Sequence, residues 1–449
     1  MSLLEKDSID NNSHNNAKKS ILLANRIDLM SIIVLFILLM GPLVSSLFLG
    51  QKEKVKQVNL YLSPRCEELF TVEIMEKLLL EFQEQNPDIK IRIGTGSAAT
   101  EKDSKKANAN DEARNKEPDI FIFDEGEFSA LVAANSLLEL NTYTNYDSGS
   151  VQHAIPLVSF MDLLFYNIKI LTEAGFASPP KTRDAFLTYA RTVSKADLNA
   201  FGSAISLNPN DRQSLSRDIF SWIWASGGNF WADEKGPNFN TRPIINDLTF
   251  LGILNREGLL APDIFNTTGN QRIEQFAQGK IAMMIASARA IPYLRGKMGD
   301  DAFGITTIPD AGTGGKYNIG ISAIYSGINS ESTHPEEAWR FLEFLAQKCP
   351  LLCEELKAIP GVVSDIIPGD YVLDDFFYSK AWDIFESARI TEGFTGKPHA
   401  MEYKATVLEE LETFFTTDRS AQETVNAIQR RWDTWDIPEL PAGESETTD

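Results

Sequence analysis

The stretch of sequence that most constrains the fold runs from Pro156 to Thr182. An apolar segment ends at Tyr166-Asn167, a short amphipathic segment follows, and Gly175 separates it from the sequence PPKT at residues 179–182. Glycine commonly ends a helix in the left-handed conformation, and PPKT precedes a new amphipathic run. The pattern predicts a buried strand, a short helix, a loop and the start of a second helix. Strand ends with short polar connections are where an α/β chain can hinge or hold a small molecule.

The residues before this stretch alternate between strand and helix patterns. The predicted elements are a strand at 58–62, a helix capped by Thr71, a strand at 89–93, a buried strand that follows Pro118-Asp119 and ends at Asp124-Glu125, and a short helix at 131–140. This order predicts a lobe with a parallel sheet. Farther on, Thr333 with Glu336 and Ser420 with Glu423 have the spacing of capping boxes and predict two helix starts. A chain of 449 residues is too long for one ordinary core, so we expect two or more lobes.

The segment Leu29–Gln51 has no charged residue and is long enough to cross a bilayer. Two interpretations remain open: a signal peptide that is cleaved near Ser46, or an uncleaved signal anchor that stays in the membrane. The polar head of residues 1–28 is long for a signal peptide, which favours the anchor. In both cases we expect the residues after about 55 to lie outside the cytoplasm, in the periplasm or at the cell surface. Residues 436–449 are acidic and are expected to form a disordered tail.

The composition argues against several classes of function. A net charge of −21 argues against nucleic-acid binding, which needs clustered Lys and Arg. The four histidines are scattered and no HExxH or CxxC motif occurs, so we expect no metal and no cofactor. The glycines of residues 312–315 are not followed by the Lys of a P-loop. Cys349 and Cys353 are four residues apart, which leaves a disulfide and two buried thiols as open alternatives.

Two groups of residues offer chemistry for a sugar. Asp124 and Glu125 are a carboxylate pair of the kind that glycosidases use. Adjacent strand residues point to opposite sides, however, so catalysis by this pair is only the second hypothesis. Phe123, Trp222 and Trp224 offer apolar ring faces that stack well on sugar rings, with core packing as the alternative for each tryptophan.

Several short motifs stand in the order found in the extracytoplasmic solute-binding proteins of ABC transporters. The motifs are PDIF (118–121), LLEL (137–140), YN (166–167), PPKT (179–182), WASGG (224–228), FAQGKIAMM (276–284), FGITTIP (303–309), GIS (320–322) and PEEAWRF (335–341). On these motifs, residues 57–435 resemble the family members of the maltose-binding-protein type. The resemblance implies a two-lobe α/β periplasmic-binding-protein fold of type II. Lobe 1 would comprise 57–158 and 307–347, lobe 2 would comprise 159–306 and 348–435, and hinges are expected near 157–160, 307–309 and 345–350.

Members of this family bind a sugar or another small solute between their lobes and present it to a membrane permease. The resemblance therefore implies capture of a carbohydrate-like ligand outside the cytoplasm, delivery to an ABC transporter permease, no enzymatic activity, and a monomer. The residues that we expect to bind the ligand are Ser63, Arg65, Phe123, Asp124, Glu125, Asn208, Arg212, Trp222, Trp224, Arg289, Ser322 and Tyr403.

At three positions where the family has an aromatic residue, this chain departs from the pattern. Arg183 follows PPKT, Arg289 follows the strand that ends in AMM, and Glu402 or Tyr403 stands at the C-terminal position. These departures argue against a maltodextrin ligand. Arg289 either binds a carboxylate or phosphate through two N–H groups or donates to sugar hydroxyls. A non-transporting binding or signalling protein of the same fold is a third hypothesis.

Overall fold

A computed structural model of the chain describes residues 55–94, 117–143, 153–196, 198–211, 213–231, 236–311, 318–360, 370–391, 393–397 and 399–434. The predicted polar head, the predicted membrane segment (29–51) and the predicted acidic tail (436–449) lie outside these residues. Among the described helices, none is both long enough and apolar enough to cross a membrane. The chain forms two compact units. The larger unit, which begins at Gln57 and leaves out residues 87–90, contains all of the described helices and the whole candidate site.

The elements follow one another in an order that alternates strands with helices over most of the chain. The strands are β1 (Lys56–Leu62), β2 (Ile89–Gly94), β3 (Ile120–Asp124), β4 (Ile155–Asn167), β5 (Phe201–Ala204), β6 (Ile281–Ser287), β7 (Phe303–Thr306), β8 (Asn318–Ile328), β9 (Ile359–Pro360) and β10 (Arg389–Thr391). The α-helices are α2 (Pro64–Leu69), α3 (Val72–Gln85), α4 (Glu125–Ala133), α5 (Ile168–Glu173), α6 (Arg183–Lys195), α7 (Ser221–Ala225), α8 (Arg242–Arg256), α9 (Gly269–Ala277), α10 (Ile291–Met298), α11 (Pro335–Gln347), α12 (Cys349–Leu356), α13 (Asp370–Asp374), α14 (Phe376–Ser387), α15 (Ala400–Thr416) and α16 (Ala421–Trp432). Shorter helical turns are η1 (Leu140–Thr142), η3 (Ser216–Phe220) and η4 (Ala288–Ala290).

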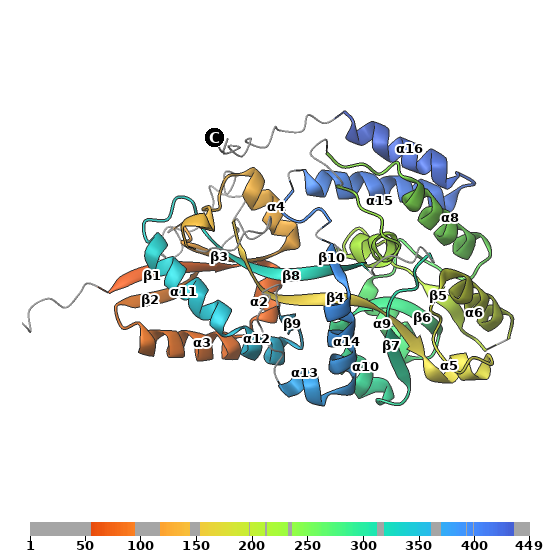
Figure 1. Cartoon of the computed structure of the whole chain (residues 1–449), viewed down its shortest axis with the longest axis horizontal. Helices are drawn as coiled ribbons and strands as arrows, with labels where there is room; N and C mark the ends of the chain where they lie inside the picture. The colour runs from red at the N-terminus through yellow and green to blue at the C-terminus, as the bar shows by residue number, and fades with distance from the viewer. Residues whose placement is uncertain are drawn as a thin grey trace, which may run out of the picture. The chain divides into compact units, whose positions relative to one another are not determined.

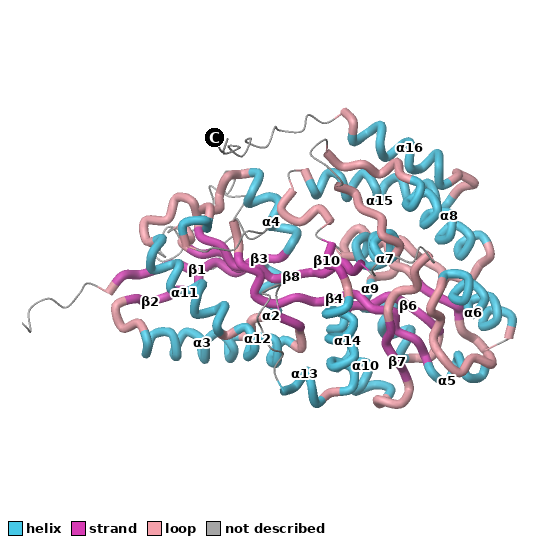
Figure 2. Tube along the Cα trace, in the orientation of Figure 1, coloured by secondary structure: helices cyan, strands magenta, loops and turns pink. Residues whose placement is uncertain are grey.

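The strands join in the order β2-β1-β3-β8-β4-β6-β5, with β10 paired to β8 and with β7 and β9 paired to β4. β4 changes partners along its length: residues 155–161 pair with β8, and residues 162–167 pair with β6 and β7. β8 also pairs with β3, so β4 and β8 connect two regions of sheet. We call the region around β1 and β3 the first lobe (residues 57–143 with α11) and the region around β5–β7 the second lobe (residues 168–306). Both are visible in Figure 1, and Figure 2 shows helices on both sides of the strands.

The central stretch folds as its sequence predicts. β4 ends at Asn167, whose side chain accepts a hydrogen bond from the Ile170 N–H (3.1 Å) and caps α5. Gly175 then has a φ of +89°, the left-handed conformation that glycine adopts without strain. The side chain of Thr182 accepts from the Ala185 N–H (3.2 Å) and caps α6. Local capping therefore fixes where these elements begin and end.

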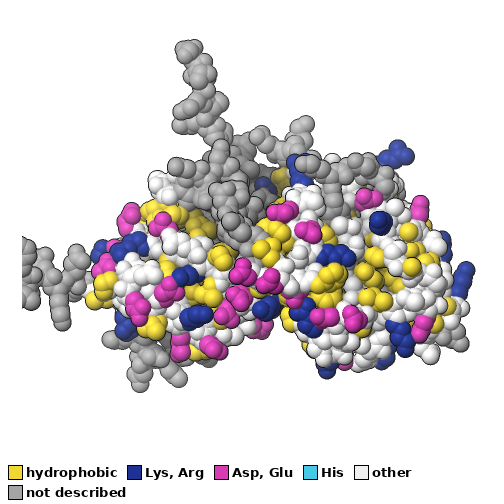
Figure 3. All heavy atoms as spheres, turned by 60° about the horizontal axis from the view of Figure 1, so that its bottom comes forward, with side chains coloured by type: hydrophobic (Ala, Val, Ile, Leu, Met, Phe, Trp, Pro, Cys, Tyr) yellow, Lys and Arg dark blue, Asp and Glu magenta, His cyan; other side chains and the backbone are white. Residues whose placement is uncertain are grey.

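Each lobe has an apolar core of its own. In the first lobe, the rings of Phe123, Phe128 and Tyr325 pack together, with centroids 4.8–6.1 Å apart. In the second lobe, Phe186 and Trp222 pack edge to face at 5.1 Å within a larger cluster that α8, α15 and α16 help to cover. On the outer face that Figure 3 presents, acidic, basic and apolar side chains are interspersed.

Two predicted helix boundaries are wrong, and one predicted capping box is confirmed. The first helix after β3 is α4, which begins at Glu125 because Asp124 accepts from the N–H groups of Gly126 (2.9 Å) and Glu127 (3.3 Å). It ends at Ala133, before most of the predicted span 131–140. α11 begins at Pro335 without a side-chain cap, so the predicted Thr333–Glu336 box does not form; proline suits the first helical position and sets the start there. The Ser420–Glu423 box is present.

Cys349 and Cys353 are buried thiols and are not joined to each other. They lie one turn apart on α12 with their sulfurs 3.8 Å apart, far beyond the length of about 2.05 Å of a disulfide bond. The Cys349 thiol donates to the carbonyl of Leu157 (3.0 Å). Of the two alternatives left open by the sequence, the structure supports the buried thiols.

α12 lies after the predicted lobe boundary at residue 348, yet it contacts first-lobe elements. Lys77 of α3 lies 3.5 Å from Glu355 of α12, and Lys348 just before α12 forms an ion pair with Glu81 of α3. These two ion pairs connect α12 to α3 of the first lobe.

Candidate functional site

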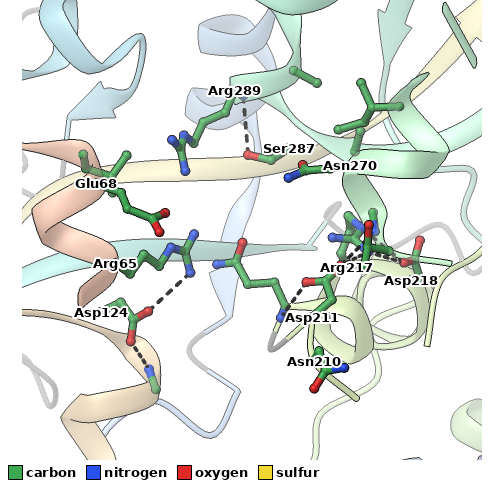
Figure 4. A pocket seen from close by; sticks show the side chains of 18 of the residues that line it. Arg65, Glu68, Asp124, Asn210, Asp211, Arg217, Asp218, Asn270, Ser287 and Arg289 are labelled. Atoms are coloured by element: carbon green, nitrogen blue, oxygen red, sulfur yellow. Dashed lines mark hydrogen bonds and ion pairs between the residues drawn. The ribbon is translucent and has the colours of Figure 1, made fainter. Parts of the chain in front are cut away.

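A cavity of about 1260 Å³ is lined by side chains of both lobes. The first lobe contributes the start of α2 and the turn between β3 and α4. The second lobe contributes residues 210, 211, 213, 217 and 218, the start of α9, and the end of β6 with η4 (Figure 4). The lining polar and charged side chains are Tyr61, Ser63, Arg65, Glu68, Asp124, Glu127, Asn210, Asp211, Gln213, Arg217, Asp218, Thr268, Asn270, Arg272, Ser287, Arg289 and Tyr293. The cavity is large enough for a small molecule and offers many hydrogen-bond donors and acceptors.

The first-lobe wall is built around two helix starts. Ser63 is 1% exposed and caps α2 by accepting from the Cys66 N–H (3.3 Å). Arg65 extends from α2 into the cavity, and its Nη1 lies 3.4 Å from Oδ2 of Asp124, the residue that caps α4. Because Asp124 already accepts two backbone hydrogen bonds, its carboxylate is held in place and serves as a fixed anchor for Arg65.

The second-lobe wall contains a buried arginine held by two carboxylates. Arg217 contacts Oδ2 of Asp218 (2.7 Å) and Oδ2 of Asp211 (3.1 Å). Burial opposes the charge of Arg217, but Asp218 and Asp211 raise its pKa above the ordinary value. Gly269, the first residue of α9, donates its N–H to Asp211 (3.0 Å), and a Cβ there would lie 2.6 Å from Nη1 of Arg217. A side chain at this position would therefore displace the guanidinium of Arg217.

Two carboxyls near Arg217, Asp218 and Asp162, have raised pKa values. Burial raises the pKa of Asp218 to about 6, although Arg217 lowers it. Burial likewise raises the pKa of Asp162 to about 7, against the effect of Arg217. Asp162 lies on β4 where that strand changes partners, opposite Ser287 of β6, and Ser221 donates to it at 3.5 Å. The ionisation of Asp162 thus depends on Arg217, which lines the cavity.

Among the described residues, the arginines that line the cavity are Arg65, Arg217, Arg272 and Arg289, and they fall into two kinds. Arg217 is paired as described, and Arg272 donates to the backbone carbonyls of Ile205 (3.1 Å) and Pro262 (2.6 Å), so both hold protein structure. Arg65 makes one long contact with Asp124. Arg289 lies over the ring of Phe160 (5.0 Å), and among the described residues no carboxylate lies within ion-pair distance of it. Burial and the charge of Arg65 lower the pKa of Arg289, while Glu68 raises it.

The structure brings four of the predicted binding residues to the cavity. Ser63, Arg65, Asp124 and Arg289 line it. Ser322 lies behind the wall and accepts a hydrogen bond from Gln213 Nε2 (2.6 Å), which does line it.

The remaining predicted binding residues lie elsewhere. Phe123, Trp222, Trp224 and Tyr403 are at most 6% exposed and pack in the cores. Glu125 forms an ion pair with Lys404 Nζ (2.7 Å), and Asn208 accepts from the Asn210 N–H (2.9 Å). Arg212 lies outside the described residues. Adjacent residues can thus lie in different surroundings: Asp124 lines the cavity, and Glu125 pairs with Lys404.

Sequence reasoning did not select several lining residues, including Glu68, Gln213, Arg217, Asn270 and Ser287. One signal was available: Thr268 and Gln271 have capping-box spacing and form such a box, which places Asn270 in the exposed first turn of α9. Asp211 and Gln213 flank the predicted Arg212. Arg217 pairs with Asp211 and Asp218, which are near it in the sequence, but no motif marks these residues as a site, and the approach of α9 at Gly269 completes their surroundings.

Comparison with known proteins places the chain in a family. The family model of bacterial extracellular solute-binding proteins matches residues 70–348. This chain belongs to that family. Curated relatives include binding proteins of Brucella abortus and Brucella suis, 23% identical over 231 residues that cover 50% of this chain and 51% of the relative. The chain thus spans about half the length of the curated relatives it matches.

Solved solute-binding proteins have the same fold. An oligosaccharide periplasmic-binding protein from Synechococcus sp. MITs9220 has a TM-score of 0.66 at 18% identity, covering 84% of this chain and 98% of that one. The sugar-binding protein MalE of Xanthomonas citri has a TM-score of 0.67 at 16% identity, covering 84% and 96%. Maltose-bound MalE3 of T. maritima has a TM-score of 0.64 at 16% identity, covering 84% and 99%. The predicted family resemblance and the two-lobe α/β fold are confirmed.

Proposed function

We propose that this solute-binding protein captures a carbohydrate-like small molecule in the cavity between its lobes and delivers it to the permease of an ABC transporter. The observation that carries the proposal is the cavity of about 1260 Å³, which is lined from both lobes and is rich in amide, hydroxyl and charged side chains. Solved neighbours are described as oligosaccharide-, sugar- and maltose-binding proteins, which supports a sugar as the ligand class.

The mode of binding that fits this lining relies on hydrogen bonds more than on stacking. Asn210, Gln213 and Asn270 provide amides, and the described lining includes only Tyr61 and Tyr293 as aromatic residues. Hydrogen bonds from both walls would be made together only when the lobes enclose the ligand. Binding would then shift the population toward the closed arrangement, with β4 and β8 as the connecting strands.

The cavity offers less support for a glycosidase. Of the Asp124–Glu125 pair, only Asp124 lines the cavity, and its carboxylate is occupied by the α4 cap and by Arg65. Glu125 is paired with Lys404. Such enzymes require two carboxyls that flank one glycosidic bond, whereas Asp124 and Glu125 make contacts with different parts of the protein.

Binding and delivery are tested separately. A thermal-shift and tryptophan-fluorescence screen against neutral and acidic mono- and disaccharides should show binding of at least one of them, and X-ray scattering should show compaction with that sugar. Uptake of the sugar by cells that lack the protein should fall and recover on complementation. A screen without any response would refute sugar capture. Glycan turnover that disappears in Asp124→Asn would support the enzyme instead.

We further propose that residues 29–51 export the protein and tether it to the outer face of the membrane, and that it acts as a monomer. The family description as extracellular supports export. Amino-terminal sequencing of the protein from isolated membranes decides between anchor and cleavage near Ser46. Light scattering after size exclusion measures its mass.

A further inference from the structure

We propose that Arg65 and Arg289 together form an anion subsite, so that the natural ligand is a sugar that carries a single negative charge, such as a uronic acid. This inference deepens the proposed function and rests on it. The two arginines come from different lobes, α2 and η4, and both line the same cavity. Figure 4 shows their guanidinium groups on the two sides of Glu68.

Arg65 and Arg289 both have N–H donors that can bind a ligand. A guanidinium carries five N–H donors in a planar fork that matches a carboxylate. Arg65 uses one of them in a contact of 3.4 Å with Asp124, whose own oxygens are already engaged by the backbone of α4. Arg289 stacks over Phe160, a contact that leaves the edge of its fork open. In contrast, Arg217 and Arg272 direct their donors to carboxylates and backbone carbonyls of the protein.

The positive charges of Arg65 and Arg289 favour an anion between them. Arg65 and Arg289 are close enough for the first to disfavour the charged form of the second. Two like charges facing one cavity raise the energy of the empty site, and an anion between them removes that cost. Asp124 already pairs with Arg65, so the positive charge without an ion-pair partner among the described residues is that of Arg289, and Glu68 offsets part of it. A monoanion such as a carboxylate matches this single charge better than a dianionic phosphate does.

The position of Arg289 suits a ligand held between the two lobes. Arg289 lies in η4, the turn that follows β6, and Phe160 under its guanidinium belongs to β4. The ring limits the motion of the side chain and keeps its fork directed into the cavity. A ligand carboxylate held by Arg65 and Arg289 would join the two walls and favour their closure around the ligand.

The test compares matched pairs of sugars by isothermal titration calorimetry on the full chain: glucose with glucuronate, galactose with galacturonate, and cellobiose with cellobiouronate. Glucose 6-sulfate and glucose 6-phosphate distinguish other anionic groups. We expect an acidic sugar to bind about 10- to 100-fold more tightly than its neutral partner, and we expect the affinity for the acidic sugar to fall as salt is added. Arg289→Gln and Arg65→Gln should each remove most of this preference.

Arg191→Gln is the matched control, because Arg191 is an exposed arginine of the second lobe that pairs with Glu257 outside the cavity. It should leave the preference unchanged, and Arg289→Lys should keep part of it. Neutral sugars that bind as tightly as their acidic partners, or a preference that survives Arg289→Gln in a folded variant, would overturn the inference while leaving sugar capture intact. A preference for the phosphate would overturn the choice of a monoanion. Failure of both sets of sugars to bind would overturn the proposed function and the inference together.

Discussion

Replacing Arg183 with glutamine should destabilise the second lobe strongly at neutral pH. The guanidinium of Arg183 is buried and forms an ion pair with Asp247, whose side chain is fully buried. It also donates to the carbonyl of Trp222 (2.6 Å) and to the hydroxyl of Ser226, and it lies 5.7 Å from the centre of the Trp222 ring. Removing Arg183 leaves a buried carboxylate without its counter-charge.

Burial disfavours the charged form of Asp247 even beside Arg183. Burial raises its pKa from 3.8 to about 6 even with Arg183 present to lower it. That difference corresponds to about 3 kcal/mol in favour of the protonated carboxyl. Breaking a buried ion pair by removing one partner typically costs about 3–5 kcal/mol, so we expect a loss of this size in Arg183→Gln at pH 7.

The direction of the pH dependence is fixed by the same numbers. The folded state keeps a proton on Asp247 that the unfolded state releases above pH 3.8. The stability contributed by this group is therefore complete below its unfolded pKa and is lost as pH rises through about 6. Without Arg183 the folded pKa rises further, so the variant should lose less stability at pH 5 than at pH 7.

Urea denaturation followed by tryptophan fluorescence measures the free energy of unfolding, and Trp222 beside Arg183 reports on this region. The double variant Arg183→Gln with Asp247→Asn removes both charges and should recover most of the loss. A loss below about 1 kcal/mol at pH 7, or a double variant no more stable than the single one, would refute the reasoning.

Three further predictions concern the site and its supports. Gly269→Ala should push Arg217 away and weaken sugar binding at least several-fold, as measured by calorimetry. Gly296→Ala, where a Cβ would meet open space, should leave binding unchanged, and equal effects of the two substitutions would contradict the prediction. On acidification from pH 8 to 5 we expect the urea midpoint to rise, because the raised folded pKa of Asp162, about 7, makes this group stabilising only at low pH. Asp162→Asn should flatten that rise, and an unchanged slope would argue against the role of Asp162. Ser420→Ala should cost about 1 kcal/mol by loss of the capping box on α16, and an unchanged urea midpoint would mean that the box is dispensable.

The sequence by itself predicted the features that depend on neighbouring residues. The end of β4 at Asn167, the left-handed turn at Gly175 and the start of α6 after Thr182 each follow from a side chain or a glycine that acts within four residues. The ordered motifs predicted the family and with it the two-lobe fold. Where another local signal competed, as Pro335 did with Thr333, the predicted boundary was wrong.

The tertiary structure alone decided which polar side chains face the cavity. Asp124 and Glu125 are adjacent in sequence, but one caps α4 beside Arg65 and the other pairs with Lys404 of α15. The aromatic residues that we expected to stack on a sugar are buried in the cores, since apolar burial stabilises the fold wherever a ring can be enclosed. Arg65 and Arg289 lie more than two hundred positions apart in the chain, and only the pairing of β4 with β6 and β8 brings them to one cavity. Short-range capping is written in consecutive residues, whereas the charge and shape of a binding site arise from contacts between distant segments.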